Sequence, residues 1–310
     1  MPTCIIEIST VIESRAPTQP ADVVALGGGH GLAVALRAIR TYATTITGVV
    51  SVADDGGSSG RLRRELGVPA PGDARRCLVA LAGSETTWVE AFEHRFESGE
   101  LEGHALGNLV IVGLAELTGD FAGALEEAGR LVDAIGRVLP ATIDPVVLKA
   151  DVEGNAVEGQ VAVATSAGRI GNIELVPEDA SAHPDAVAAI GIADQVVLAP
   201  GSLYTSLLPA LCVRGIRDAL AVTPARVVQV ANLRTQSPET DGLDATDHLR
   251  VVLDHGVRVD AFVYQEGGEL AADPGAIREL GVEPIAVGVA DDRLALHEPA
   301  RLARALDALL

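Results

Sequence analysis

The stretch Asp22-Val-Val-Ala-Leu-Gly-Gly-Gly-His-Gly-Leu-Ala-Val-Ala-Leu-Arg-Ala-Ile39 predicts a strand, a glycine loop and a helix in succession. Its first five residues form a short apolar run that stops at glycines, and Leu32–Ile39 has apolar residues at helical spacing. A second strand is predicted over Thr45–Val52. This opening indicates an α/β fold with a Rossmann-like, doubly wound and mostly parallel sheet, in which ligands bind beyond the carboxyl ends of the strands.

The composition fits one large α/β domain built around an aliphatic core. The chain has 310 residues, of which 48% are hydrophobic and only 3% aromatic, so Ala, Val, Leu and Ile must fill the core. We expect a flexible leader over residues 1–20 and a single domain over residues 21–310. Alternation in Val146–Val152 and Gly159–Thr165 predicts strands of antiparallel hairpins, and thus a small β-rich insertion over residues 140–177.

Charge and cysteine content narrow the class of partner. The formal net charge is −20, which argues against nonspecific binding to nucleic acids or to anionic membranes. No apolar run reaches the roughly 20 residues of a membrane span, and the N-terminus lacks the pattern of a signal peptide. The three cysteines have no C-x-x-C pair and predict reduced thiols. We therefore expect a cytoplasmic protein without membrane insertion and without a nucleic-acid partner.

The first glycine loop is a candidate phosphate site. Gly28, Gly29, His30 and Gly31 lie between a predicted strand and a predicted helix, where free N–H groups favour an anion. The pattern is not the dinucleotide fingerprint, because the third glycine of G-x-G-x-x-G is absent. A tight turn without a ligand is the alternative.

A second loop follows in Ser51-Val-Ala-Asp-Asp-Gly-Gly-Ser-Ser-Gly-Arg-Leu-Arg63. Asp54 and Asp55 are candidates to hold Mg²⁺ or a ribose hydroxyl, because Mg²⁺ is commonly bound by one or two carboxylates plus phosphate oxygens. The phosphate candidates after them are Ser58, Ser59, Gly60 and Arg61. The alternatives are that the aspartates cap a turn, that the serines cap a helix over Arg61–Leu66, and that the arginines form a solvated helix face.

Other candidates follow later strands and turns. Asp73 is predicted to cap a helix that begins at Ala74, and Arg76 lies in that helix. The segment Pro200-Gly-Ser-Leu-Tyr-Thr-Ser206 follows a predicted strand and opens a helix predicted over Leu203–Leu211. It predicts a second anion site, and two anion sites suit a diphosphate. The remaining ligand candidates are Asn108, Gly201, Ser202, Tyr204, Thr205, Asn232 and Thr235. The polar residues 232–236 and 239–241, here called the polar cluster after Asn232, either contact a sugar or base of the ligand or only cap a helix at Ala245.

Taken together, these motifs resemble the YvcK branch of the CofD-like family, whose members are called gluconeogenesis factors. The resemblance rests on the two glycine loops, Pro71-Gly-Asp73, Gly103-His-Ala-Leu-Gly-Asn-Leu109 and Pro200–Ser206. It implies a cytoplasmic bacterial protein with a role in cell shape and envelope growth on gluconeogenic carbon. It also implies binding of a UDP-sugar such as UDP-N-acetylglucosamine, with the glycine loop, Asp54, Asp55, residues 58–61, Asn108 and residues 201–202 lining the site.

Three functional hypotheses follow. The first is a nucleotide-sugar-binding regulator, with protein partners in envelope synthesis and a homo-oligomeric state left open. The second is a Mg²⁺-dependent transferase that moves phospholactate from a nucleotide diphosphate to a deazaflavin acceptor, as the CofD relatives do. In it, Asp54 or Asp55 would hold the metal, and Arg61 and Arg76 would stabilise the leaving group. The third is a scaffold whose pocket is vestigial.

Overall fold

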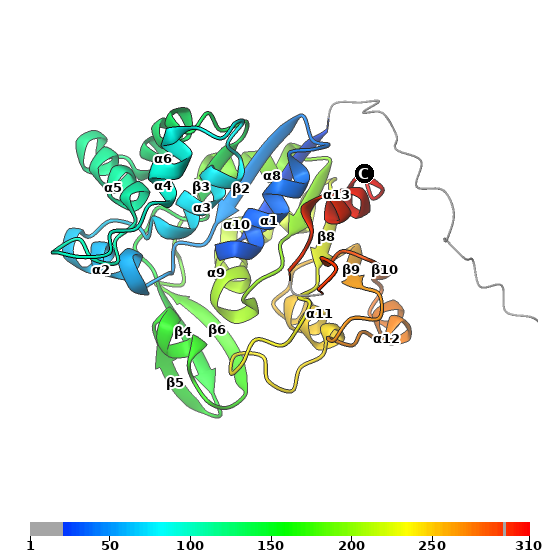
Figure 1. Cartoon of the computed structure of the whole chain (residues 1–310). Coiled ribbons are helices and arrows are strands. Elements are labelled where there is room, and N and C mark those ends of the chain that lie inside the picture. Colours follow the sequence, from blue (N-terminus) through cyan, green and yellow to red (C-terminus); the bar gives the residue numbers. More distant parts are fainter. Residues whose placement is uncertain (1–20, 294–295) are drawn as a thin grey trace, which may run out of the picture.

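A seven-stranded sheet in the order β10-β9-β8-β7-β1-β2-β3 lies at the centre of the computed structural model, which describes residues 21–293 and 296–310 (Figure 1). Each pair of neighbouring strands runs parallel. The predicted α/β class with a mostly parallel sheet is therefore confirmed, and the predicted leader lies outside the described residues. The strands are β1 (Asp22–Gly27), β2 (Thr45–Val50), β3 (Arg137–Pro140), β7 (Gln195–Leu198), β8 (Arg226–Val230), β9 (Ala261–Gln265) and β10 (Glu283–Val287).

Helices flank the sheet because parallel strands need crossover connections. The helices are α1 (Gly29–Ile39), α2 (Gly57–Leu66), α3 (Gly72–Ala80), α4 (Thr87–Glu93), α5 (Leu106–Thr118), α6 (Phe121–Leu131), α8 (Pro184–Ile192), α9 (Leu208–Cys212), α10 (Arg214–Val222), α11 (Ala245–Asp254), α12 (Pro274–Glu279) and α13 (Pro299–Asp307). The chain moves from β1 to β2 in one direction and from β7 to β8 in the other. Right-handed crossovers then put α1 and α10 on opposite faces. On its face, α1 packs against α3 and α13 (Figure 1).

The strand order reverses between β1 and β7, which is where ligands bind in doubly wound sheets. At this point the loop after β1 presses against the loop after β7. A Cβ atom added to Gly31 would lie 1.6 Å from the carbonyl oxygen of Pro200 and 3.0 Å from the Cα of Gly201. Only glycine permits this approach, so two loops about 170 residues apart in the sequence share one edge of the sheet.

The core is aliphatic, as the composition predicts. Val23 to Leu26 of β1 and Val196 to Leu198 of β7 are buried, and Phe92 and Phe262 are the largest fully buried side chains. In the described part of the chain, no helix has the length and apolarity that crossing a membrane requires.

A small antiparallel sheet in the order β5-β4-β6 forms the predicted β-rich insertion (Figure 1). Its strands are β4 (Val147–Val152), β5 (Asn155–Glu158) and β6 (Ile170–Val176). The strand predicted over Gly159–Thr165 is wrong, because residues Gln160–Ala164 form helix α7. A tertiary contact favours the helix: Asp55, from the second loop, accepts hydrogen bonds from the first N–H groups of α7.

Three further local predictions differ from the structure. The second loop is already helical from Gly57, so Ser58 and Ser59 lie inside α2 and do not cap it. Asp73 lies in the first turn of α3, and Pro71 occupies the N-cap position. The predicted helix over 203–211 begins as a π-helical turn, η1 (Leu203–Leu207), that continues into α9. In addition, α6 and β3 were not predicted from the sequence, although Asp120 caps α6 with its side chain.

The contact between Gly31 and Pro200 gives a stability prediction. We expect Gly31→Ala to lower the free energy of unfolding by about 3 kcal/mol, because the added methyl group must push two backbone loops apart. Gly113→Ala is the matched control: Gly113 lies inside α5 with open space around its Cα. This control should gain about 0.5–1 kcal/mol from helix propensity. Urea unfolding measures both, and equal effects would contradict the assigned contact.

Candidate functional site

A cavity of about 300 Å³ opens beyond the carboxyl ends of β1 and β2. The first turns of α1, α2 and α3 contribute most of its lining, joined by single residues from α5, α7 and the segment after β7. The lining residues are Gly29, Asp54, Gly56, Gly57, Ser58, Ser59, Gly72, Asp73, Arg75, Arg76, Arg95, Asn108, Gln160 and Ser206. A larger hollow of about 530 Å³ lies between α6 and β3 and contains none of the predicted residues. We take the smaller cavity as the candidate site, because helix N-termini and arginines converge there.

Three helix N-termini make the cavity suitable for an anion. The first N–H groups of a helix have no partner within the helix, and the helix dipole adds a partial positive charge. In α2 the N–H groups of Gly57, Ser58 and Ser59 have no hydrogen-bond partner among the described residues. In α3 the N–H of Gly72 donates to Ser59 Oγ. The start of α2 therefore offers unused donors to a ligand.

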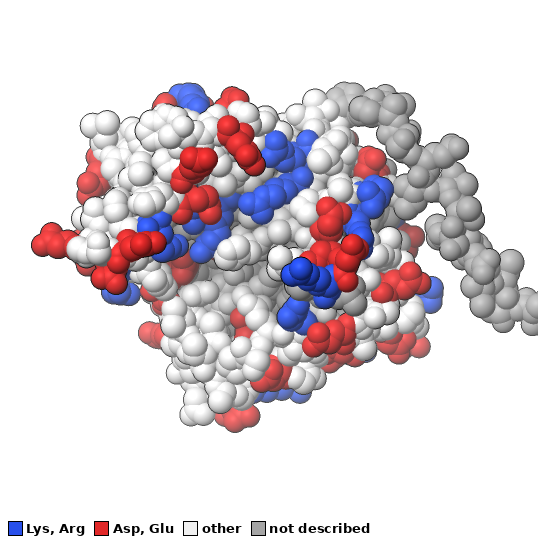
Figure 2. All heavy atoms as spheres, in the orientation of Figure 1, with Lys and Arg blue, Asp and Glu red and all other residues white. Residues whose placement is uncertain are grey.

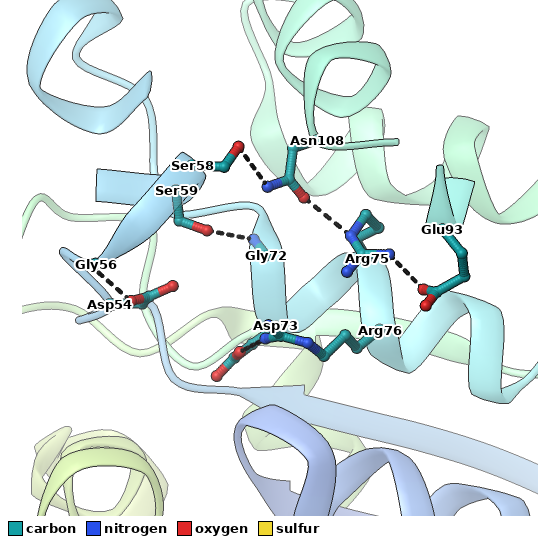
Figure 3. A network of polar contacts seen from close by, with 10 residues as sticks. All are labelled: Asp54, Gly56, Ser58, Ser59, Gly72, Asp73, Arg75, Arg76, Glu93 and Asn108. Carbon is teal, nitrogen blue, oxygen red and sulfur yellow. Dashed lines mark hydrogen bonds and ion pairs between the residues drawn. The ribbon is translucent and has the colours of Figure 1, made fainter. Parts of the chain in front are cut away.

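Arginines add positive charge to this part of an acidic protein. Figure 2 shows arginine side chains gathered in the middle of the face that carries α3 and α1, with acidic side chains around them. Arg75, Arg76 and Arg95 line the cavity itself. Arg76 pairs with Asp73 at 2.7 Å, and Arg75 is buried and pairs with Glu93 (Figure 3). The lining thus carries three arginines against two aspartates, in a chain whose net charge is −20.

The two adjacent aspartates have different positions. Asp54 lines the cavity, and its Oδ1 accepts a hydrogen bond of 3.0 Å from the N–H of Gly56 (Figure 3). Both oxygens of Asp55 instead accept N–H groups of α7, from Gln160 and Val161, at 2.9 Å each. Of the pair, only Asp54 reaches the cavity, while Asp55 ties the insertion to the second loop.

Asp73 supplies the second carboxyl group of the cavity. Burial raises its pKa, and the charge of Asp54 raises it further, whereas Arg76 and the N–H of Gly29 act in the opposite direction. Gly28 makes room for this carboxyl group, because a Cβ atom on Gly28 would lie 2.6 Å from Asp73 Oδ2. Asp73 is therefore held between the starts of α1 and α3, where the sequence predicts ligand contact.

A buried chain of hydrogen bonds runs along one wall of the cavity (Figure 3). Asn108 donates from Nδ2 to Ser58 Oγ at 3.0 Å and accepts from Arg75 Nε at 3.1 Å. Arg75 also donates to the carbonyl oxygen of Phe92 at 2.9 Å. Asn108 is only 2% exposed. Its side chain amide is thus occupied by protein groups, and Asn108 orients Ser58 and Arg75.

The other predicted residues of the first two loops lie outside the lining. Arg61 donates from Nη2 to the carbonyl oxygen of Glu102 at 2.7 Å, so its predicted place beside a phosphate is not seen. Gly60 is buried within α2, and His30 and Gly31 lie in the first turn of α1. His30 is exposed there.

The start of η1 is filled by a carboxylate of the chain itself. Glu239 accepts hydrogen bonds from the N–H groups of Tyr204 at 2.8 Å and Thr205 at 3.2 Å, and from Thr205 Oγ1 at 3.1 Å. Its side chain is buried, which raises its pKa. The polar cluster after Asn232 therefore caps this helix rather than the one at Ala245, and the predicted second anion site is occupied from within.

Asn232 has a supporting position in the same region. Its amide accepts from the N–H of Gly201 at 2.7 Å and donates to the carbonyl oxygen of Gly201 at 2.8 Å. Ser202 Oγ accepts from Gln236 at 2.7 Å. These residues and the half-buried Thr235 lie outside the cavity lining. They fix the Pro200 loop against which Gly31 packs.

Seven of the lining residues were not singled out from the sequence, and three of them have long polar side chains: Arg75, Arg95 and Gln160. The other four are Gly56, Gly57, Gly72 and Ser206. Arg75 is adjacent to the predicted Arg76, but the sequence does not show which of two adjacent arginines faces inward. Arg95 and Gln160 arrive from segments whose positions depend on tertiary packing.

Comparison with known proteins identifies relatives along most of the chain. A family model described as 2-phospho-L-lactate transferase CofD matches residues 23–286. A gluconeogenesis factor of Halalkalibacterium halodurans is 40% identical over 291 residues, which cover 89% of this chain and 90% of the relative. That of Bacillus subtilis is 41% identical over 239 residues, covering 76% and 75%. The crystal structure of a UPF0052 family member from Bacillus halodurans superposes with a TM-score of 0.88 at 38% identity, covering 93% of this chain and 99% of that one.

The different positions of the two aspartates lead to a prediction. Asp55→Ala should lower the free energy of unfolding by about 1 kcal/mol, because it removes the cap of α7. It should also speed amide hydrogen exchange at Gln160 and Val161. The exposed Asp179, replaced by alanine, is the control and should change stability by less than about 0.5 kcal/mol. Unchanged exchange in Asp55→Ala would contradict the capping role.

Proposed function

We propose that this chain, which belongs to the CofD family and resembles gluconeogenesis factors along most of its length, binds a nucleotide sugar and acts as a regulator. UDP-N-acetylglucosamine is the ligand we favour. The observation that carries the proposal is the convergence of three helix N-termini and three arginines on one cavity of about 300 Å³. Such a cavity suits the phosphates of a small ligand, and its arginines cover too small an area for the phosphate backbone of a nucleic acid.

Both phosphates of a nucleotide sugar would lie at the starts of α1, α2 and α3. The alternative position, at the start of η1, already holds the carboxylate of Glu239. The unused N–H groups of Gly57, Ser58 and Ser59, together with Arg76 and Arg95, supply donors for phosphate oxygens. The nucleoside and the sugar would extend along the edge of the sheet from there.

The cavity also fits a Mg²⁺ ion that arrives with the phosphates. Asp54 and Asp73 present two carboxyl groups in the same lining. Within the described residues, no group of three or more His, Cys, Asp or Glu side chains is arranged to hold a metal. Phosphate oxygens and water would therefore complete the coordination, as is common for Mg²⁺. The ion would neutralise phosphate charge beside Asp54, while the chain's own donors orient the ligand.

The cellular role follows from the resemblance. We place the protein in the cytoplasm, where it would report the supply of cell-wall precursor to the enzymes of envelope synthesis during gluconeogenic growth. In this role ligand binding is the signal, and turnover is not required.

Isothermal titration calorimetry with UDP-N-acetylglucosamine tests the proposal. We expect binding by the wild type, and a loss of about 10-fold or more in affinity for Arg76→Ala, because a charged hydrogen bond is worth about 1.5–3 kcal/mol. Arg278→Ala, on the exposed surface of α12, is the control and should bind normally. Titrations with Mg²⁺ and with EDTA separate the contribution of the ion. Absence of heat with the wild type, or equal losses in both variants, would overturn the proposal.

A second candidate is the phospholactate transfer named in the family description, which the match over residues 23–286 favours. Here a hydroxyl of a deazaflavin acceptor would attack the phosphorus of the lactyl phosphate. The nucleoside monophosphate would leave, and the hydroxyl proton would pass to solvent.

Mass spectrometry after incubation with acceptor, activated phospholactate and Mg²⁺ tests this reaction. For a regulator we expect no product above the level of an Asp54→Ala control. Product at enzyme-like rates, lost in Asp54→Ala and retained in Arg278→Ala, would establish the transferase instead.

A further inference from the structure

We propose that the adjacent serines Ser58 and Ser59 recognise opposite hydrogen-bonding groups of the ligand. Ser59 donates to an anionic oxygen, Ser58 accepts from a ligand hydroxyl, and His104 is the positioning residue that fixes this polarity. The inference deepens the proposed function, because it names the chemistry of the ligand beside its phosphates. Both serines line the cavity and both are buried.

The polarity of Ser58 follows from Asn108. Arg75 Nε carries only a hydrogen, so the Asn108 atom that it approaches at 3.1 Å must be the oxygen Oδ1. The other end of the amide, Nδ2, then donates to Ser58 Oγ at 3.0 Å. One lone pair of the Ser58 hydroxyl is thereby used, and its hydrogen must point elsewhere.

His104 takes that hydrogen. Its Nδ1 lies 3.0 Å from Ser58 Oγ. A neutral imidazole has one nitrogen that accepts, and we assign that role to Nδ1 with the ring proton on Nε2, so that the Ser58 hydroxyl donates to Nδ1. With the hydrogen and one lone pair engaged, the Ser58 hydroxyl offers a ligand only its remaining lone pair. Ser58 is therefore an acceptor.

The surroundings of His104 favour the neutral ring. Burial lowers its pKa most, followed by the charge of Arg61; Arg95 also lowers it, and Glu65 opposes them. Arg61 and Glu65 belong to α2, and Arg95 to the segment that pairs with Ala105. At neutral pH the neutral ring is thus favoured, and its Nδ1 is able to accept from Ser58.

Ser59 has the opposite polarity. Its Oγ accepts a hydrogen bond of 3.1 Å from the N–H of Gly72 (Figure 3). Among the described residues this hydroxyl donates no hydrogen bond, and Ser59 is itself one of the first three residues of α2, whose N–H groups are unused. Ser59 therefore has a donor available for an anionic oxygen.

A matching ligand carries a hydroxyl close to a phosphate, as in a sugar phosphate or the ribose or hexose of a nucleotide sugar. An anion without hydrogens matches Ser59 alone. Sulfate is such a probe, since it carries no proton between pH 5 and pH 8, and UDP-N-acetylglucosamine supplies both groups.

The first test compares the two probes by calorimetry and NMR titration. Ser58→Ala should weaken UDP-N-acetylglucosamine roughly 3- to 10-fold, the effect of one hydrogen bond, and change sulfate binding by less than about 2-fold. Ser59→Ala should weaken both probes. Equal effects of Ser58→Ala on both probes would contradict the assignment of Ser58 as an acceptor and Ser59 as a donor. If the wild type binds sulfate but not the UDP-sugar, the proposed function fails. Sulfate binding that depends on Ser59 and not on Ser58 would still support the opposite roles of the two serines.

The second test concerns His104. A protonated ring would donate to Ser58 Oγ, occupy its lone pair and turn its hydrogen toward the cavity. On acidification below the usual histidine pKa of about 6.5, affinity for UDP-N-acetylglucosamine should fall and affinity for sulfate should rise. His104→Asn retains an acceptor and should bind the UDP-sugar within about 2-fold of the wild type. His104→Phe should lose roughly 3- to 10-fold in affinity for UDP-N-acetylglucosamine. This variant should also lack the pH step, that is, the change in affinity on acidification.

Thermal unfolding of each variant verifies that it is folded before titration. If the pH step persists in His104→Phe, or if His104→Asn and His104→Phe bind alike, the positioning role of His104 is wrong.

Discussion

The site depends on the close approach of two backbone loops, in which the Cα of Gly31 faces the carbonyl oxygen of Pro200. This contact joins the loop after β1 to the loop after β7, where the strand order reverses. Since no side chain intervenes, α1 begins directly at the edge of the sheet, next to the starts of α2 and α3. The position of the start of α1, which forms one side of the candidate cavity, follows from that packing.

Carboxylates of the protein determine which helix starts remain available to a ligand. Asp55 caps α7, Glu239 caps η1, and Asp73 lies between α1 and α3. Buried N–H groups need acceptors, and an internal carboxylate meets that need without a ligand. The start of α2 is different, because no side chain caps it and its first three N–H groups have no hydrogen-bond partner among the described residues. The preference for an exogenous anion is therefore concentrated where capping by the protein is missing.

Sequence patterns predict those features that local physics decides. The apolar run of β1, the glycines after it and the helical spacing of α1 indicate the α/β class, because burial and backbone freedom act over short distances. The difference between Asp54 and Asp55 is not predictable in this way, because it depends on α7, about 100 residues later. The same holds for Glu239, whose helix partner precedes it by some 35 residues. Alternation over Gly159–Thr165 is compatible with a strand, and a tertiary cap makes it a helix instead.

Hydrogen bonds along one wall of the cavity fix the directions of its donors and acceptors. Arg75, Asn108 and Ser58 form a chain in which each donor meets an acceptor, so turning the Asn108 amide over would leave the Nε–H of buried Arg75 unpaired. A buried unpaired group costs about 1–3 kcal/mol, which favours the observed arrangement by about 5- to 160-fold. The donors and acceptors of the cavity are therefore ordered before a ligand binds, so binding carries no further entropic cost of ordering them. In the proposed function, a site of this kind would separate small phosphorylated compounds by the positions of their hydroxyls.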